Sequence, residues 1–190
     1  MVVPDIAKSA ATVLALGADE VLVGPASDLG PVDPQIELGE GRWFAAKDIV
    51  AAVVEAERAV AGNRSLTPLW ASLLEDVSAV DVQAAKAELQ RTGPLIRQAL
   101  SYRSEPLDAG RTDELVALLI LHLQDEPATR GASLGPSELH SLGLPVTRAD
   151  PNSWVWECIW RLWALYWVQI RGPIYESARG SYRPDGPHPA

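Results

Sequence analysis

The sequence predicts a helix-rich α/β domain. Most of the chain shows the three- to four-residue spacing of apolar positions that is typical of helices, most clearly in residues 42–61, 76–102 and 152–170. Near the N-terminus, a helix of small residues is followed by the run VLVG, which is short enough to be a buried strand. Helices that alternate with such strands cover a sheet in α/β folds.

Length and charge limit the possible functions. The chain has 190 residues, enough for one domain with a sizeable core. Hydrophobic residues make up 47% and charged residues 22%, which is ordinary for a globular protein. The formal net charge is −9, which opposes general attraction to nucleic acid or to anionic lipid. We therefore expect neither a nucleic-acid partner nor contact with a membrane.

The single cysteine, Cys158, excludes an internal disulfide and is expected to be a small core residue in a reducing compartment. The sequence has no zinc-ligand spacing and no glycine-rich phosphate loop, so we expect no metal and no cofactor. It also has no charged start followed by an apolar signal segment. These observations predict a cytoplasmic protein.

The first helix is expected just after Pro4, with Asp5 as a possible cap and Gly17 as its end. Residues 18–24 then form the buried strand. The next ten residues contain three prolines and a glycine, and we expect them to lack regular structure.

Three helices are expected in the middle of the chain. Residues 42–61 begin with two aromatic residues and continue as an amphipathic helix. Residues 67–75 form a second helix, and residues 76–102 a third that is interrupted at 93–94, where glycine precedes proline. These helices either cover the sheet or form an arm or an oligomer contact, and the sequence does not decide between the two.

The next segment contains an apolar helix that Thr112 is expected to cap. Residues 125–135 are expected to form a loop, and residues 137–142 a short helix that Gly143 ends.

The last helix is expected at residues 152–170, capped by Ser153. Four of its tryptophans fall on one face: Trp156, Trp160, Trp163 and Trp167. A membrane span needs about 20 apolar residues, and this segment carries Glu157 and Arg161. The tryptophan face is therefore expected to pack on the domain or on a neighbouring subunit. Docking at a membrane surface is the alternative, but the polar face has few basic residues. Residues 183–190 read as a flexible tail.

Ser9 is the first candidate for chemistry. A serine at the start of a helix lies among free backbone N–H groups, and its small neighbours would let a substrate backbone come close. The alternative is that Ser9 only caps the helix or fills a crowded contact with the sheet. Lys8 suggests a serine–lysine pair, but adjacent residues of a helix do not face each other.

The segments AKSAAT and ADEVLVGPASDLGPVDPQI resemble the serine dehydrogenase proteinase family, which is related to the ClpP peptidases. The match is dense over residues 4–36 and looser to about Tyr175. The resemblance implies a ClpP/crotonase-like fold, with Ser9 as the nucleophile. It implies that Asp33 is the acidic member of a Ser-Asp-His triad. The chain would then be a single partial peptidase domain over residues 1–182, with the tryptophan-rich helix at 152–171.

Two features depart from the family. Arg130 occupies the position of the family's histidine, and a guanidinium stays protonated, so it cannot accept the proton of the serine. His140, ten residues later, is the best replacement base, whereas His122 lies alone in an apolar run and His188 in the tail. Only eight residues precede Ser9, so we expect the N-terminal strands of the fold and its oxyanion loop to be missing.

Two functions follow as expectations. The first is a ClpP-like serine peptidase that acts on peptide or protein substrates as a homo-oligomer, with part of the site supplied from elsewhere. The second is a catalytically inactive relative that oligomerises or binds a partner. In a weaker version of the second, the tryptophan face is the partner-binding surface.

Overall fold

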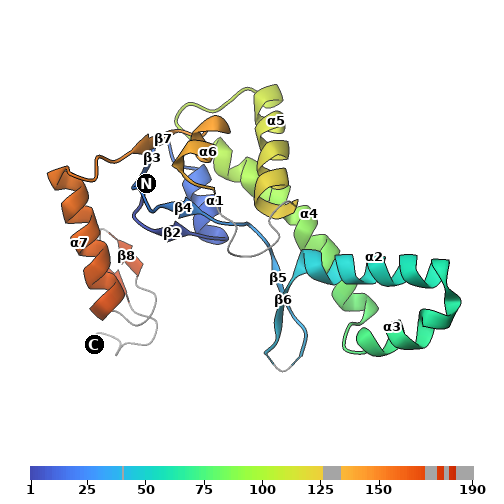
Figure 1. Cartoon of the computed structure of the whole chain (residues 1–190). Helices are drawn as coiled ribbons and strands as arrows, with labels where there is room; N and C mark the ends of the chain where they lie inside the picture. Colours follow the sequence, from blue (N-terminus) through green and yellow to red (C-terminus); the bar gives the residue numbers. More distant parts are fainter. Residues whose placement is uncertain (40, 126–133, 170–174, 178–179, 183–190) are drawn as a thin grey trace.

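The computed structural model describes residues 1–39, 41–125, 134–169, 175–177 and 180–182. It shows a mixed α/β protein that is rich in helix and has small parallel sheets (Figure 1). The coarse fold class is therefore confirmed. Arg130, His188 and the tail at 183–190 lie outside the described residues.

A three-stranded parallel sheet lies in the main body. β3 (Val21–Val23) is its central strand, with β1 (Val2–Val3) on one side and β7 (Val146–Arg148) on the other. Val2 pairs with Leu22, and Val21 pairs with Val146. β3 coincides with the strand expected from VLVG, and its two outer residues are almost fully buried.

A second parallel pair joins β2 (Ile6–Ala7) to β4 (Asp28–Leu29). This pair corrects two expectations. Asp5 does not cap the first helix, because the next two residues are held in a strand and helix α1 begins only at Ala10 (Ala10–Leu16). The proline-rich segment is also not wholly irregular, since it contains β4. Gly17 ends α1 as expected.

The main core lies between these strands and helices α1, α4 (Ala79–Ser101) and α5 (Ala109–Ile120). Helix α1 lies so close to α4 that a Cβ atom on Gly17 would be 2.9 Å from the carbonyl oxygen of Ala99. The most buried large side chains of the main core are Leu16, Leu29, Ile96, Leu119, Leu123 and Leu139.

An arm extends from this body (Figure 1). It consists of the antiparallel hairpin β5 (Gln35–Glu37) and β6 (Trp43–Ala45), helix α2 (Ala46–Gly62), the 3-10 turn η1 (Arg64–Leu66), helix α3 (Thr67–Leu73) and the first half of α4. The arm has a small core of its own around Leu38, Ala46, Ile49 and Ala85. Helices α2 and α3 and the first half of α4 therefore form an arm, whereas the second half of α4 belongs to the main core.

Two helix boundaries differ from the sequence expectation. Helix α4 is continuous through Pro94, although the sequence predicts an interruption there. The residues around this proline are buried against α5, where the Ile120 side chain would meet a Cβ on Gly93 at 3.1 Å, so packing overrides the local cost of the proline. Helix α5 is capped by Asp108, which accepts a hydrogen bond from the Arg111 amide, and not by Thr112.

The remaining elements are π-helical turn η2 (Leu121–Asp125), helix α6 (Pro136–Ser141), helix α7 (Trp154–Gln169) and the antiparallel strands β8 (Tyr175–Ser177) and β9 (Gly180–Tyr182). Gly143 follows α6 at a φ of 77°, a conformation that favours glycine. Ser153 caps α7 as expected, since its hydroxyl accepts from the Trp156 amide at 3.2 Å. Within the described residues, no helix is long and apolar enough to cross a membrane.

Helix α7 is attached to the body through Trp156. The ring of Trp156 covers Gly24, which follows β3, and this side chain is only 6% exposed. Cys158 lies on the exposed part of the same helix, so the expectation of a core cysteine is wrong. Residues two positions apart on a helix point about 200° apart, so Cys158 faces away from the side on which Trp156 covers Gly24.

We predict that Gly24→Ala detaches α7. A Cβ atom there would lie 2.0 Å from Cζ2 of Trp156, so the indole must leave its position. Such overpacking lowers the free energy of unfolding by about 1–3 kcal/mol, which urea denaturation followed by far-UV circular dichroism would measure. Gly62→Ala is the control, because nothing lies within 4 Å of that position and its change should be roughly neutral. Equal stability of the two variants would contradict the role given to Trp156.

Candidate functional site

Ser9 lies at the junction of β2 and α1 in an unusual backbone conformation. Its φ is 53° and its ψ is −117°, and it is the one non-glycine residue with positive φ in the described part of the chain. Such a conformation costs about 1–3 kcal/mol and persists only where the surrounding structure enforces it. The residue is also exposed. Strained, exposed residues of this kind cluster at active sites.

The backbone of Ser9 is held on both sides. Its amide donates to the carbonyl oxygen of Pro31 at 2.9 Å, and its carbonyl accepts from the Val13 amide at 3.2 Å. Its hydroxyl, however, makes no capping hydrogen bond to α1. Ser9 thus occupies the N-cap position, but the interpretation that its side chain caps the helix is wrong.

The side chain of Thr12 stabilises this junction from the interior of the protein. Its side chain is fully buried, and its hydroxyl lies 2.9 Å from the carbonyl oxygens of both Ala7 and Gly30. The Gly30 amide in turn donates to the Ala7 carbonyl at 2.7 Å. These bonds join the end of β2, the start of α1 and the segment after β4, and thus fix the chain on either side of Ser9.

Asp33 lies on the segment that Ser9 contacts, two residues after Pro31. Its side chain is buried at 7% exposure, and one carboxylate oxygen accepts from Nε2 of Gln35 at 3.2 Å. The structure therefore brings the two predicted site residues onto adjoining segments. Asp33 lies below the surface, whereas Ser9 lies on it.

The π-helical turn η2 lies against the same segment. The Val32 amide donates to the carbonyl oxygen of Leu123 at 2.9 Å, which places His122 and Asp33 each one residue from this bond. His122 is half-buried. Turns of π-helix inside α-helices are rare and occur frequently at functional sites. His122 could not be singled out from the sequence, because its link to the Asp33 segment joins residues far apart in the chain.

The other candidate bases lie elsewhere or are differently engaged. His140 is on α6 and exposed, and its carbonyl accepts from the Gly143 amide. The aliphatic part of Lys8 covers Gly30, where a Cβ atom would lie 2.4 Å from Cγ of the lysine. Gly30 is thus needed for the close approach of Lys8 to the segment beside Ser9.

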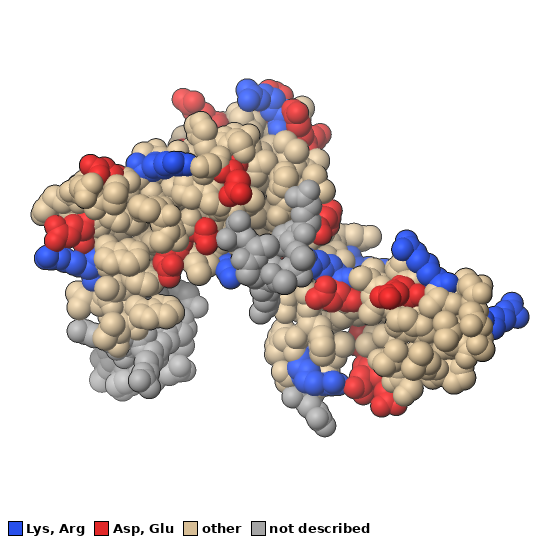
Figure 2. Space-filling model, viewed as in Figure 1, with Lys and Arg blue, Asp and Glu red and all other residues tan. Residues whose placement is uncertain are grey.

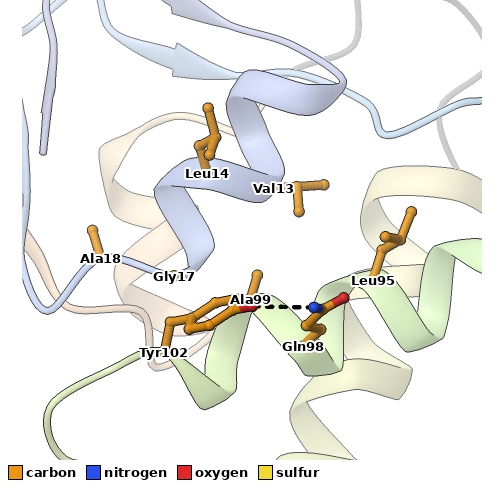
Figure 3. A pocket seen from close by; sticks show the side chains of 8 residues that line it. All are labelled: Val13, Leu14, Gly17, Ala18, Leu95, Gln98, Ala99 and Tyr102. Atoms are coloured by element: carbon orange, nitrogen blue, oxygen red, sulfur yellow. Dashed lines mark hydrogen bonds between the residues drawn. The ribbon is translucent and has the colours of Figure 1, made fainter. Parts of the chain in front are cut away.

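An apolar groove begins one helical turn from Ser9, between α1 and α4 (Figure 3). Its volume is about 410 Å³, and it is lined by Val13, Leu14, Gly17, Ala18, Leu95, Gln98, Ala99 and Tyr102. At one side, Nε2 of Gln98 donates to the Tyr102 hydroxyl at 3.1 Å. A groove with this lining can take an apolar side chain.

In the described part of the chain, no group of three or more His, Cys, Asp or Glu residues could hold a metal ion. Figure 2 shows acidic and basic side chains interspersed over the visible face, without a large basic patch. The region therefore combines an exposed serine, a buried carboxylate, a half-buried histidine on η2 and an apolar groove.

We predict that Thr12→Val weakens the support of Ser9. The change removes the hydroxyl that donates to the buried carbonyl oxygens of Ala7 and Gly30. The Ala7 oxygen still accepts a hydrogen bond from the Gly30 amide, but the Gly30 oxygen loses its Thr12 donor. We therefore expect the free energy of unfolding to fall by about 1–3 kcal/mol. Chemical denaturation measures this loss. In the control Thr147→Val, the lost partner is the exposed carboxylate of Glu20, which water solvates, so the cost should be below about 0.5 kcal/mol. Equal costs would contradict the supporting role of Thr12.

Comparison of the chain with family models, with curated proteins and with solved structures finds no match. The assignment of a function therefore depends on the geometry around Ser9 and on the sequence motifs themselves.

Proposed function

We propose that the chain is a serine hydrolase of the ClpP-like peptidase class, with Ser9 as its nucleophile. The observation that carries the proposal is the strained and exposed conformation of Ser9 between β2 and α1, with a hydroxyl that does not cap the helix. A sharp turn from strand to helix presents a nucleophilic hydroxyl to a substrate in other hydrolases. The resemblance of AKSAAT and LGPVDPQ to the serine dehydrogenase proteinase family supports the same residue, and with it a ClpP/crotonase-like fold.

His122 is the general base in this proposal, and Asp33 is the buried carboxylate that stabilises it when it is protonated. The support is the backbone bond between Val32 and Leu123, which lies next to both residues. In this proposal, His122 takes the role of the family's histidine. Arg130 occupies that position in this chain, and its guanidinium stays protonated and cannot accept a proton. His140 is the alternative base, but it is exposed on a separate helix.

The reaction then follows the usual course of acyl transfer. Ser9 Oγ attacks the carbonyl carbon of the peptide bond, and its proton passes to the imidazole of His122. The C–N bond of the tetrahedral intermediate breaks as the imidazolium returns the proton to the leaving amine. Water, deprotonated by the same imidazole, hydrolyses the acyl-enzyme and releases Ser9. The Ala10 amide, next to the nucleophile, is the donor that this chain offers to the oxyanion.

We predict that a fluorophosphonate probe labels Ser9. Ser9→Ala should abolish the labelling, and His122→Gln should slow it by about 10²-fold or more, since general-base catalysis contributes this much. His140→Gln is the matched control and should label at the wild-type rate. The measurement is the labelling rate by intact mass spectrometry, with the site assigned by peptide mapping. If the wild-type chain is folded but is not labelled, the proposal is wrong.

We also predict that Ser9→Gly makes the protein more stable while it removes labelling. Glycine adopts positive φ freely, so the change relieves about 1–3 kcal/mol of strain and costs about 0.5–1 kcal/mol of chain entropy. The free energy of unfolding should rise by roughly 1 kcal/mol, as measured by urea denaturation. Ser9→Ala retains the strain and should change stability by less than about 0.5 kcal/mol. A glycine variant less stable than the alanine variant would contradict the strain.

A second candidate function is that of a non-catalytic protein that associates with itself. The observation that favours it is the exposure of α7, whose outer face consists largely of apolar side chains. The labelling experiment separates the two functions, because only the first requires a reactive Ser9.

A further inference from the structure

Helix α7 carries an apolar surface at one end of the molecule, opposite the arm (Figure 1). In this helix, Trp156 is the only buried residue among those whose exposure the structure describes. The large apolar side chains that remain more than half exposed are Trp154, Val155, Leu162, Leu165, Trp167 and Val168. Six such side chains on one helix of this length are far more than scattered surface residues would give.

The tryptophans occupy one face of α7. Trp160 and Trp163 stack at 4.8 Å between ring centroids, and Trp163 and Trp167 stack at 5.5 Å. Trp156, at the body end of this row, covers Gly24. This face is thus organised by contacts within the chain.

The opposite face has a different character. We call Val155, Cys158, Leu162 and Leu165 the outer seam. They follow one another at steps of three, four and three residues, which is the spacing of the a and d positions of a coiled coil. All four are exposed. Within the chain itself, Val155, Leu162 and Leu165 remain 54%, 55% and 53% exposed. A seam of this spacing is suited to contact another helix.

The charges of α7 determine which partner fits. Its only ionic groups within the described helix are Glu157 and Arg161, which pair at 2.6 Å across one turn beside the seam. The helix therefore offers no cationic face to anionic lipid, and at about 24 Å it is shorter than a bilayer core. A two-fold axis across the seam would instead bring two such ion pairs together, with two negative and two positive groups in balance.

We propose that α7 pairs antiparallel with α7 of a second copy of this chain through the outer seam. In an antiparallel pair, a positions face d positions, so Val155 of one copy lies opposite Leu165 of the other. Cys158 likewise lies opposite Leu162. The two contacts of each kind are related by the two-fold axis, so the seam is complementary to itself and closes into a dimer. This inference does not depend on catalysis at Ser9.

The first test is the oligomeric state of the full chain by sedimentation velocity over a range of concentrations. We expect a dimer that Leu162→Glu converts to a monomer, with a shift in dissociation constant of at least 100-fold. Leu69→Glu on α3 is the matched control, because Leu69 and Leu162 are 54% and 55% exposed, and it should leave the dimer intact. A wild-type monomer, or a dimer that survives Leu162→Glu, would overturn the proposal.

The second test concerns the register and uses the single cysteine. Leu162→Cys should place Cys158 of one copy opposite the new thiol of the other, so mild oxidation gives a covalent dimer on a non-reducing gel. The wild-type chain should not cross-link, because its Cys158 faces a leucine. A parallel pair would instead place the two Cys158 residues together, so cross-linking of the wild type would reject the antiparallel arrangement.

The third test measures binding to vesicles of phosphatidylcholine with phosphatidylglycerol. If the wild-type chain is a monomer and sediments with these vesicles, and Leu162→Glu abolishes this binding, the seam binds lipid and the dimer proposal is rejected. A dimer that does not sediment with them agrees with the proposal.

Discussion

The short parallel pairing of β2 with β4 is the constraint on which the site depends. It holds Ile6 and Ala7 in a strand, so the chain has two residues in which to turn before α1 begins at Ala10. The turn is tight enough to force Ser9 to positive φ, and the bonds of Thr12 and Pro31 prevent it from relaxing. The strain at Ser9 is thus maintained by the pairing of β2 with β4 and by the hydrogen bonds of Thr12 and Pro31.

The same pairing aligns the acidic segment. Because β4 runs parallel to β2, the chain that leaves β4 continues alongside the chain that leaves β2. Pro31 therefore meets Ser9, and Asp33 follows immediately in a buried position. The bond from Val32 to Leu123 extends this row to η2, so three distant parts of the sequence converge through consecutive backbone hydrogen bonds.

Local signals account for what the sequence predicted of the fold. VLVG, Gly17, Gly143 and the Ser153 cap are each specified by a few neighbouring residues, and each is found where expected. Expectations that depend on packing were wrong. The buried residues around Pro94 keep α4 continuous, and Cys158 is exposed because α7 contacts the body through its other face.

The candidate site also combines features that the local sequence predicts with features that depend on contacts between distant residues. Ser9 and Asp33 can be proposed from the sequence, because each belongs to a recognisable segment. The backbone strain at Ser9 cannot, since it results from strand pairing between residues about twenty positions apart. His122 also cannot be found from spacing, because its link to the Asp33 segment is a backbone hydrogen bond that joins residues 32 and 123.

Apolar surface is distributed differently over the main body, the arm and helix α7. The main body has a core of buried aliphatic side chains, and the arm has a smaller core of its own. Helix α7 buries only Trp156 among its described side chains, although most of its residues are apolar. A helix held this way gains little from its own chain, so its hydrophobic free energy becomes available only when a second surface covers it. If that surface is another α7, association and folding of this helix are linked, and its order depends on protein concentration.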